Sequence, residues 1–564
     1  MYKAKNLKLR NKLLLIGIIL LAFILRFWKL DQYPALNADE AAIGYNAYSL
    51  QETGKDEHGN NWPIHFQSFN DYKPGFYFYL VLPFVKFLGL NEWAVRIPGA
   101  TLGVLSVLVM HFLIKELFND GKSEIGNDGR TTSLRKLEIL APAFLAISPW
   151  HIHFSRGGWE VNTALFFMLL GLYLFFKGIK NLPLLMLSGV SFVFSLYTYH
   201  SARIVIPLLG LGLLIIYRKR IRENLKNFIL AGVVMLVAVL PLVKDFTRTD
   251  VVSRAAGVGL FADTGPLTRI NEQRGEHSDF QGKIPRVLHN KLVNYGLALL
   301  KNWTDHFHGE FLFLNGDPIQ RNKVPETGQM YLFDLVFTVA GLIYIFRYYY
   351  QNTKSYSLII WWLVIGPTAA ALTFQSPHAL RSQNMVIPLT FISALGLVYI
   401  IQLLRAQKKL ILEIGNWLLF ILVIWQIARY EHMYWVHMAK EYQFSSQYGL
   451  KELASFVKEN QNKYEKIIIT DRYDQPYILL LFYLRYSPEK FQQEHILSSR
   501  DKFGFSTVRN FDKFEFRQIV WDIDQPKNPN SLLIGTDQEV PNEANIIKEI
   551  YGTNGYKYFE VVAN

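Results

Sequence analysis

Three acidic residues stand at the edges of long apolar runs, and they are the first candidates for chemistry. Asp39 and Glu40 are adjacent in NADEAAIGYNAYSL, shortly after the first run, and Glu160 follows HFSRGGW just before another run. A carboxylate at such a boundary can serve as a general base toward a hydroxyl group when it faces a cavity. We therefore treat Asp39, Glu40 and Glu160 as candidate catalytic residues.

Two of these acids also have a simple structural explanation. Asn37 and Glu40 have the spacing of a capping box, which accounts for Glu40 as a residue that starts a helix. Neighbouring helical residues point about 100° apart, so that one acid can cap the helix while Asp39 faces a cavity. Glu160 stands four residues after Arg156, and an ordinary surface ion pair between them is the alternative to a functional role.

A set of cations occupies the same side of the predicted membrane. Lys73 lies in DYKPG, while Arg156, Arg203 and Arg381 each lie in a short loop, with His378 close to Arg381. An Arg guanidinium donates two hydrogen bonds at once to a phosphate, and Lys acts as a point charge. We predict that these five residues bind one phosphate group; contact with lipid headgroups is the alternative. The histidines of these loops lack the tight spacing of metal ligands, so we predict no metal site.

Composition sets the class of protein in which these residues work. The 564-residue chain is 51% hydrophobic and 15% aromatic although 19% of its residues are charged, because the apolar residues are concentrated in runs. Concentrated runs are typical of a polytopic membrane protein. The net charge of +13 comes from short basic clusters between the runs, which indicates membrane orientation and no nucleic-acid partner. The chain has no cysteine, which excludes disulfides, thiol catalysis and thiolate-bound zinc.

About eleven apolar runs have lengths near the roughly 20 residues that a bilayer requires. They cover residues 12–30, 94–114, 136–149, 160–177, 182–198, 203–217, 227–243, 331–348, 357–374, 384–404 and 410–428. Six basic segments fall on one side, which the positive-inside rule makes cytoplasmic: MYKAKNLKLRNK, GRTTSLRK, KGIK, YRKRIREN, FRYYYQNTK and RAQKK. All the candidate residues fall on the opposite side, as does the C-terminal region. We expect a multi-pass protein of the plasma membrane whose active site and C-terminal domain are extracytoplasmic.

The segments between the spans suggest further elements. In the first outer loop, 31–93, DEAAIGYNAYSLQETG reads as an amphipathic helix on the outer interface and PGFYFYLVLPFVKFLG as a second interfacial or re-entrant helix. A long outer loop, 244–330, is expected to be partly ordered on the active face.

A change of pattern after the last span predicts a second domain. We assign residues 1–430 to the transmembrane domain and 431–564 to a small soluble α/β domain, with helices at 445–459 and 475–485 and strands in KIIIT, FRQIVWDI, SLLIG and YKYFEVV. WDID at Trp521–Asp524 resembles a metal-nucleotide-sugar motif, but a turn at the end of a strand is the simpler interpretation.

Several of these segments together resemble a known family. NADEAAIGYNAY, YKPGFYFYL followed by NEWAVRIPGA, SPWHIHFSR and PHALRSQNMVIPL resemble the bacterial glycosyltransferase family 39-like proteins of the GT-C superfamily, which includes protein O-mannosyltransferases and lipid A aminoarabinose transferases. The resemblance covers roughly residues 10–405. It implies a GT-C membrane fold, a polyprenyl-phosphate sugar donor, inversion at the sugar and Asp39 as the base. Lys73 matches the lysine near the donor phosphate, and Arg156 with Glu160 matches an Arg-x-x-x-Asp in which Glu replaces Asp.

The resemblance and the residues lead to one expected function and one alternative. We expect an inverting glycosyltransferase that moves a sugar from a polyprenyl phosphate to an extracytoplasmic hydroxyl on a protein, lipid or envelope glycan. No cofactor is required by this hypothesis, which leaves the role of a divalent metal open. The alternative is a transporter or flippase for a lipid-linked sugar. Transporters usually place charged residues near the middle of the membrane, whereas the candidates here gather at one face.

Overall fold

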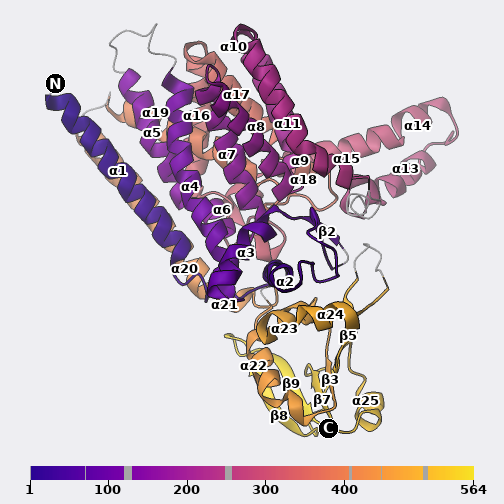
Figure 1. Cartoon of the computed structure of the whole chain (residues 1–564). Coiled ribbons are helices and arrows are strands. Elements are labelled where there is room, and N and C mark those ends of the chain that lie inside the picture. The colour runs from indigo at the N-terminus through magenta and orange to yellow at the C-terminus, as the bar shows by residue number, and fades with distance from the viewer. Residues whose placement is uncertain are drawn as a thin grey trace.

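A bundle of long helices forms one end of the molecule, and a domain with a mixed sheet forms the other (Figure 1). The computed structural model describes residues 2–69, 71–119, 130–247, 257–405, 409–445, 447–499 and 506–564. The N-terminus lies at the end of the bundle that is farthest from the sheet, on the same side as the basic helix α10 (Arg218–Glu223). The C-terminus lies in the sheet domain.

Each predicted span coincides with helical structure. The helices are α1 (Tyr2–Phe27), α4 (Glu92–Asn119), α5 (Arg130–Ile147), α7 (Glu160–Gly178), α8 (Leu182–Thr198), α9 (Ala202–Ile216), α11 (Leu225–Asp245), α16 (Leu332–Tyr348), α17 (Thr353–Ile365), α19 (Val386–Arg405) and α20 (Lys409–His432). The predicted span 357–374 is not one helix. Because Pro367 lacks a backbone N–H, α17 ends before it and a separate short helix, α18 (Thr368–Ala371), follows.

Some of these helices are long and apolar enough to cross a bilayer, and others are shorter. Within the described ranges, four helical segments are long and apolar enough to do so: Glu92–Phe118, Glu160–Gly178, Leu225–Asp245 and Gln383–Arg405. Shorter neighbours pack closely against them. For example, Ser188 and Ser195 of α8 donate hydrogen bonds of 2.7 and 2.8 Å to carbonyls of α7. Small polar residues are typical of such close helix contacts. The total of eleven spans therefore stays a prediction.

The first outer segment folds into a compact unit beneath the bundle. It contains α2 (Ala38–Thr53), the hairpin β1 (His65–Ser68) and β2 (Asp71–Pro74), and α3 (Phe76–Leu88). The expectation that α2 is an amphipathic helix on the membrane surface is wrong. Ala41, Ile43 and Tyr45 point in different directions around α2, and all are fully buried, because α3 and α23 (Pro476–Leu484) cover it from different sides.

The described part of the long outer segment contains several helices, as the prediction of partial order expects. After α11 it forms η2 (Leu260–Ala262), α13 (Gly265–Gly275), α14 (Lys283–Leu288), α15 (Lys291–Asp305), the short π-helix η3 (Glu310–Leu314) and the 3-10 helix η4 (Gln320–Asn322). In Figure 1, α13, α14 and α15 project sideways from the bundle. Other short elements are α6 (Pro149–Ser155), η5 (Tyr349–Gln351), η6 (Gln383–Met385), η7 (Met433–His437) and α21 (Met438–Glu441).

The C-terminal region forms an α/β domain around a seven-stranded sheet. Its strands are β3 (Lys466–Ile469), β4 (Ile496–Leu497), β5 (Val508–Phe511), β6 (Phe514–Phe516), β7 (Ser531–Gly535), β8 (Ile546–Tyr551) and β9 (Lys557–Ala563), in the order β4-β5-β6-β3-β7-β9-β8. The central strand β3 is parallel to β6 and β7, and the other pairs are antiparallel. The helices are α22 (Leu450–Asn460), η8 (Gln461–Lys463), α23, α24 (Pro488–Glu494) and α25 (Trp521–Lys527).

Side chains on the two faces of this sheet enter different clusters. Ile467 and Ile469 of β3 join α22 and α23 in one core, while Ile468 faces the other way and packs with Leu533 and Val562. The first of these cores also contains buried residues of α2, α3 and the start of α4, among them Ala42 and Val81. The C-terminal domain and the first outer segment therefore share one apolar core. The boundary at 430/431 stays a prediction.

Candidate active site

The acidic pair divides at the start of α2, and Glu40 faces the protein interior. Asn37 Oδ1 accepts the N–H of Glu40 at 3.0 Å, and Glu40 Oε2 accepts the N–H of Asn37 at 3.3 Å, which confirms the predicted capping box. The Glu40 carboxylate also forms a bidentate ion pair with Arg96, at 2.6 and 2.7 Å, and accepts the N–H of Gly158 at 2.8 Å. Both side chains of the ion pair are buried. Glu40 thus joins α2, α4 and the segment before α7.

Asp39 lies beside Glu40 in sequence but meets different partners. Its carboxylate is 27% exposed and forms an ion pair with the Lys73 ammonium through Oδ1, while Oδ2 lies 3.6 Å from Arg321 Nη1. The Lys73 side chain is only 9% exposed and lies over the Phe69 ring at 4.9 Å. The structure therefore brings together one partly exposed acid and two cations from three separate segments.

The hairpin places Lys73 through its register and through Gly75. Phe66 of β1 pairs with Lys73 of β2. A Cβ atom at Gly75 would lie 2.6 Å from the carbonyl oxygen of Ile64 and 2.7 Å from the Phe66 ring, so that only glycine fits between the hairpin and α3. The Lys-Pro-Gly sequence is thus explained by a close approach of two backbones.

Arg321 reaches Asp39 from η4 in the long outer loop. Its backbone carbonyl lies 2.9 Å from His153 Nε2. A carbonyl oxygen only accepts, so Nε2 carries a proton, and burial lowers the pKa of His153 to about 4, which keeps the ring neutral. The Arg321 side chain itself is 47% exposed. Reasoning from the sequence did not single out Arg321, and its only signal was the expected order of the loop around it.

Arg156 is buried at a different junction. Its guanidinium donates to the Tyr434 hydroxyl at 3.0 Å, to the Leu25 carbonyl at 2.9 Å and to the Trp28 carbonyl at 2.7 Å, and it lies over the Trp435 ring. These contacts join the end of α1 and the residues that follow it to η7, the short helix after α20. Its predicted role at the donor phosphate stays a prediction, and the observed contacts favour a structural role.

Glu160 is the first residue of α7. Helix α6 ends at Ser155 and α7 begins at Glu160, so that Arg156 and Glu160 do not follow each other on one helix. The i,i+4 geometry assumed for an ion pair between them is therefore wrong. Glu160 is half-buried two residues after Gly158, at the junction that Glu40 holds.

The remaining predicted phosphate ligands lie in two other clusters. Arg203 donates to the Leu196 carbonyl at 3.1 Å and contacts His200 Nδ1 at 2.9 Å and His65 Nε2 at 2.7 Å, while His65 is paired with Asp245. This cluster ties the β1–β2 hairpin to α9 and α11.

The second cluster lies around the loop before η6. Arg381 donates to the Thr373 hydroxyl at 2.7 Å. His378 donates its backbone N–H to His306 Nε2 at 3.1 Å, and its Nδ1 lies 3.7 Å from Asp317. These contacts stabilise the loop through both residues, and their role at a phosphate stays a prediction.

The structure places the WDID motif, the candidate for metal chemistry, in the C-terminal domain. In WDID, Asp524 forms a bidentate ion pair with Arg517 at 2.6 and 2.8 Å, and Trp521 starts the short helix α25 instead of a turn at a strand end. Asp524 is thus engaged in the fold. In the part of the chain that the structure describes, no group of three or more His, Cys, Asp or Glu residues is arranged to hold a metal ion.

Comparisons with known proteins agree with this fold. A family profile described as dolichyl-phosphate-mannose-protein mannosyltransferase matches residues 16–123, a stretch that includes Asp39, Lys73 and Arg96. No curated protein matches the chain. Among solved structures, ArnT from Cupriavidus metallidurans bound to undecaprenyl phosphate matches with a TM-score of 0.51 and 13% identity over 97% of both chains. Its apo state gives the same TM-score and coverage at 12% identity.

An archaeal structure extends the comparison. The oligosaccharyltransferase AglB from Archaeoglobus fulgidus, in complex with an inhibitory peptide and a dolichol-phosphate, matches at a TM-score of 0.48 and 13% identity over 85% of this chain, which spans 64% of AglB. The chain thus shares its fold with ArnT over nearly its whole length, and residues 16–123 match the mannosyltransferase profile, in agreement with the resemblance expected from the sequence.

Proposed function

We propose that this protein is an inverting glycosyltransferase that moves a sugar from a polyprenyl phosphate to the hydroxyl of an extracytoplasmic acceptor. The observation that carries the proposal is the position of Asp39 between Lys73 and Arg321. One acid that can accept a proton and two cations that can hold a phosphate are the groups that such a transfer requires. The family profile over residues 16–123 and the ArnT-like fold support the same reading.

The chemistry follows from these three side chains. The donor phosphate takes Lys73 and Arg321 as its partners, which releases the Asp39 carboxylate from both cations. Asp39 then accepts the proton of the acceptor hydroxyl, and the oxygen of that hydroxyl attacks the anomeric carbon of the sugar. The bond between that carbon and the phosphate oxygen breaks, and the electron pair leaves with the polyprenyl phosphate. A single displacement inverts the configuration, and the two cations stabilise the negative charge on the leaving group.

The other candidates take supporting roles in this proposal. Glu40 is a positioning residue, because its carboxylate is engaged by Arg96, Gly158 and the helix cap. Glu160 is retained as a second acid near the site.

The location of the site relative to the membrane is also part of the proposal. Basic clusters, including α10, lie at the end of the bundle that carries the N-terminus, and the sheet domain lies at the opposite end. By the positive-inside rule, Asp39 and the C-terminal domain then face the outside of the plasma membrane. A donor attached to a lipid of the same membrane suits that side. No nucleic-acid partner enters the proposal.

The test uses membrane vesicles that contain the natural acceptors. Vesicles with wild-type protein or Asp39→Asn receive a polyprenyl-phosphate sugar with a radiolabel in the sugar, and labelled products are separated from the lipid donor. We expect the variant to lose transfer by about 10²–10⁴-fold, while Asp305→Asn, which removes a similarly exposed acid in α15, leaves transfer unchanged.

Two results would contradict the proposal. Transfer that survives Asp39→Asn at normal protein levels removes the base assignment. Translocation of the labelled lipid across liposomes without a new glycosidic bond favours the flippase.

Chelation of divalent metals with EDTA is expected to leave transfer intact, because the proposed step uses only side chains of the chain itself.

A further inference from the structure

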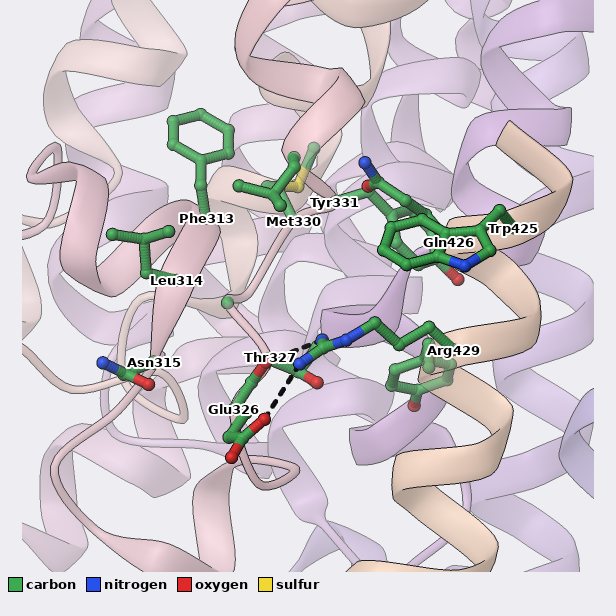
Figure 2. A pocket seen from close by; sticks show the side chains of 13 residues that line it. Phe313, Leu314, Asn315, Glu326, Thr327, Met330, Tyr331, Trp425, Gln426 and Arg429 are labelled. Atoms are coloured by element: carbon green, nitrogen blue, oxygen red, sulfur yellow. Dashed lines mark hydrogen bonds and ion pairs between the residues drawn. The ribbon is translucent and has the colours of Figure 1, made fainter. Parts of the chain in front are cut away.

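A pocket with one acidic and one basic side chain opens beside the outer ends of α16 and α20, away from the contacts that define the Asp39 site. Its volume is about 530 Å³, and it is bounded by η3, the segment 326–332 and the last turns of α20. Figure 2 shows Arg429 of α20 reaching toward Glu326, with Trp425 and Phe313 on the walls. Nothing in the proposed sugar transfer uses this pocket.

The charged groups of the pocket form a single exposed pair. Arg429 Nη1 donates to the Glu326 carbonyl at 2.9 Å, and Nη2 donates to Glu326 Oε2 at 3.0 Å. The Arg429 side chain is 37% exposed and the Glu326 side chain 71% exposed. Both charges therefore remain accessible to a ligand, and their sum is zero.

Most of the other polar groups of the walls bond within the protein, although Asn315 is exposed and its amide donates to Glu310. Gln426 Oε1 accepts the N–H of Phe333 at 3.2 Å, the Tyr331 hydroxyl donates to the Ile147 carbonyl at 2.8 Å, and the Thr327 hydroxyl donates to a neighbouring carbonyl at 3.0 Å. The charged groups with which the walls of the pocket can bind a ligand are thus one cation, Arg429, and one anion, Glu326, side by side.

The position of Arg429 along α20 matches the headgroup level of a membrane. Lys409 and Arg429 lie about 30 Å apart along the helix at 1.5 Å per residue, which is close to the thickness of a hydrocarbon core. Between them most exposed side chains of α20 are apolar, Glu413 and Asn416 excepted, and Trp425 is 57% exposed. Trp is typical of the membrane interface. A lipid headgroup would therefore meet Arg429 at the right depth.

The apolar rim offers a path for acyl chains. Leu332 and Leu335 of α16 are 44% and 46% exposed, and Ile421 of α20 is 58% exposed. These side chains continue from the pocket along the surface that faces the membrane. The pocket thus combines a polar mouth with an apolar face, as a diacyl lipid requires.

We propose that this pocket binds a zwitterionic phospholipid with a primary ammonium headgroup, of the phosphatidylethanolamine type. Its phosphate pairs with Arg429, its ammonium group pairs with Glu326, and its acyl chains lie along α16 and α20. A lipid with net negative charge would bring its phosphate to Arg429 but would leave Glu326 without a cation in return, so that the neutral pair selects a neutral headgroup that carries both charges. The site is independent of the proposed transfer reaction.

The experiment uses the full chain in nanodiscs of phosphatidylcholine with a trace of photoreactive phosphatidylethanolamine. After illumination, labelled peptides are mapped by mass spectrometry, and labelling is competed with unlabelled lipids. We expect labels within 326–335 and 421–430. Unlabelled phosphatidylethanolamine, put in place of part of the phosphatidylcholine, should compete at mole fractions at least about tenfold lower than phosphatidylglycerol, the ratio that loss of one charge-assisted hydrogen bond gives.

Variants separate the charge pair from general lipid contact. Arg429→Gln and Glu326→Gln should each reduce labelling about tenfold. The control removes another ion pair of the predicted outer side, Lys301→Gln with Asp305→Asn in α15, and should leave labelling unchanged. The combination Glu326→Arg with Arg429→Glu keeps an ion pair for folding but exchanges the two charges, and it should lose the preference for phosphatidylethanolamine.

Three outcomes overturn the proposal. Labelling that is equal in wild type and both glutamine variants shows that the charges do not select the lipid. Equal competition by phosphatidylethanolamine and phosphatidylglycerol identifies a non-selective surface. Stronger competition by phosphatidylglycerol identifies a site for anionic lipids.

Discussion

At the scale of single residues, two neighbouring acids have acquired different environments. Glu40 is buried against Arg96, whereas Asp39 is partly exposed between Lys73 and Arg321. The sequence was sufficient to predict this division, because the capping box assigns Glu40 to the helix start and leaves Asp39 to face elsewhere. It was insufficient for Arg321, which comes from a loop more than 200 residues away, because no spacing in one chain reveals which loops meet.

The position of Arg321 predicts an effect on the donor. Replacing it with Gln keeps hydrogen bonding but removes the charge that we assign to the donor phosphate. We expect the KM for the polyprenyl-phosphate sugar to rise by on the order of tenfold or more, as loss of a charge-assisted hydrogen bond implies. Arg269→Gln, an exposed arginine in the same long segment, is the matched control. An unchanged KM for the Arg321 variant would remove this residue from the phosphate site.

The buried ion pair predicts a loss of stability. In Glu40→Gln, the Arg96 guanidinium stays buried without its carboxylate partner, which typically costs about 3–5 kcal/mol. We expect a lower thermal transition in detergent and less folded protein. Glu452→Gln breaks an exposed pair with Lys548 and should change the transition little. If both variants melt alike, the Glu40–Arg96 pair does not hold the junction together.

At the scale of elements, hydropathy predicted the helices of the bundle but not what covers α2. The apolar runs of the spans are visible in the sequence because a bilayer demands them. The burial of α2 depends on α23, which lies in another domain, so its residues alone suggested a surface helix. The strand predicted in FRQIVWDI is wrong: only Phe516 lies in a strand, β6, and the segment ends in helix α25. The short strand β4 was missed, and so were β5 and β8. These last two carry alternating polar residues, as in VRNF and IIKEIY, because only part of each strand is buried.

One residue connects the C-terminal domain to the start of α2. Gln447 Oε1 accepts the N–H of Ala38 at 2.6 Å, and its amide nitrogen donates to the carbonyls of Tyr473 and Asp474. Gln447 also lines a cavity of about 330 Å³ between the two parts. We therefore expect it to set the position of Asp39, the residue that follows Ala38.

Gln447→Ala should lower kcat by about tenfold or more, because a small displacement of a base weakens proton transfer, while the KM for the donor and the thermal transition change little. Gln447→Glu keeps the acceptor for Ala38 and should restore part of kcat. Equal losses in kcat for both variants would argue against a positioning role. The measurement is the steady-state rate at varied donor concentration.

At the scale of the whole molecule, the junction between the two domains contains a buried acid. Burial, with a further contribution from Asp56, raises the pKa of Glu57 to about 8. Because the folded protein binds this proton more tightly than the unfolded chain, the unfolding free energy falls as pH rises from about 4.5 to 8. Burial lowers the pKa of the adjacent His58 to about 3, so that His58 has the opposite effect, confined to pH values below about 6.5.

Between pH 6.5 and 8 the contribution of Glu57 therefore dominates in this cluster. We expect the thermal transition of the wild-type protein to fall over this range, and Glu57→Gln to make it flatter. Glu459→Gln, an exposed acid of α22, serves as the control. A slope that is the same in wild type and Glu57→Gln would show that another group sets the pH dependence.

The absence of cysteine allows a direct test of the proposed orientation. Lys527→Cys places a thiol on the exposed surface of the sheet domain, and Lys219→Cys places one on α10 at the other end. In intact cells, a membrane-impermeant maleimide should label the first variant and reach the second only after permeabilisation. The reverse pattern would place Asp39 on the cytoplasmic side and remove the argument for a lipid-linked donor.

The core shared by the C-terminal domain and the first outer segment limits how such proteins can be recombined. A chimera that exchanges only residues after 430 would set a foreign apolar surface against α2 and α3, and the mismatch would reach the helix that carries Asp39. The unit that can be inherited or transplanted intact is therefore discontinuous in sequence: the segment from Leu36 to Val95 must travel with its distant partner. Acceptor preference, if it resides in the sheet domain, evolves together with the base rather than apart from it.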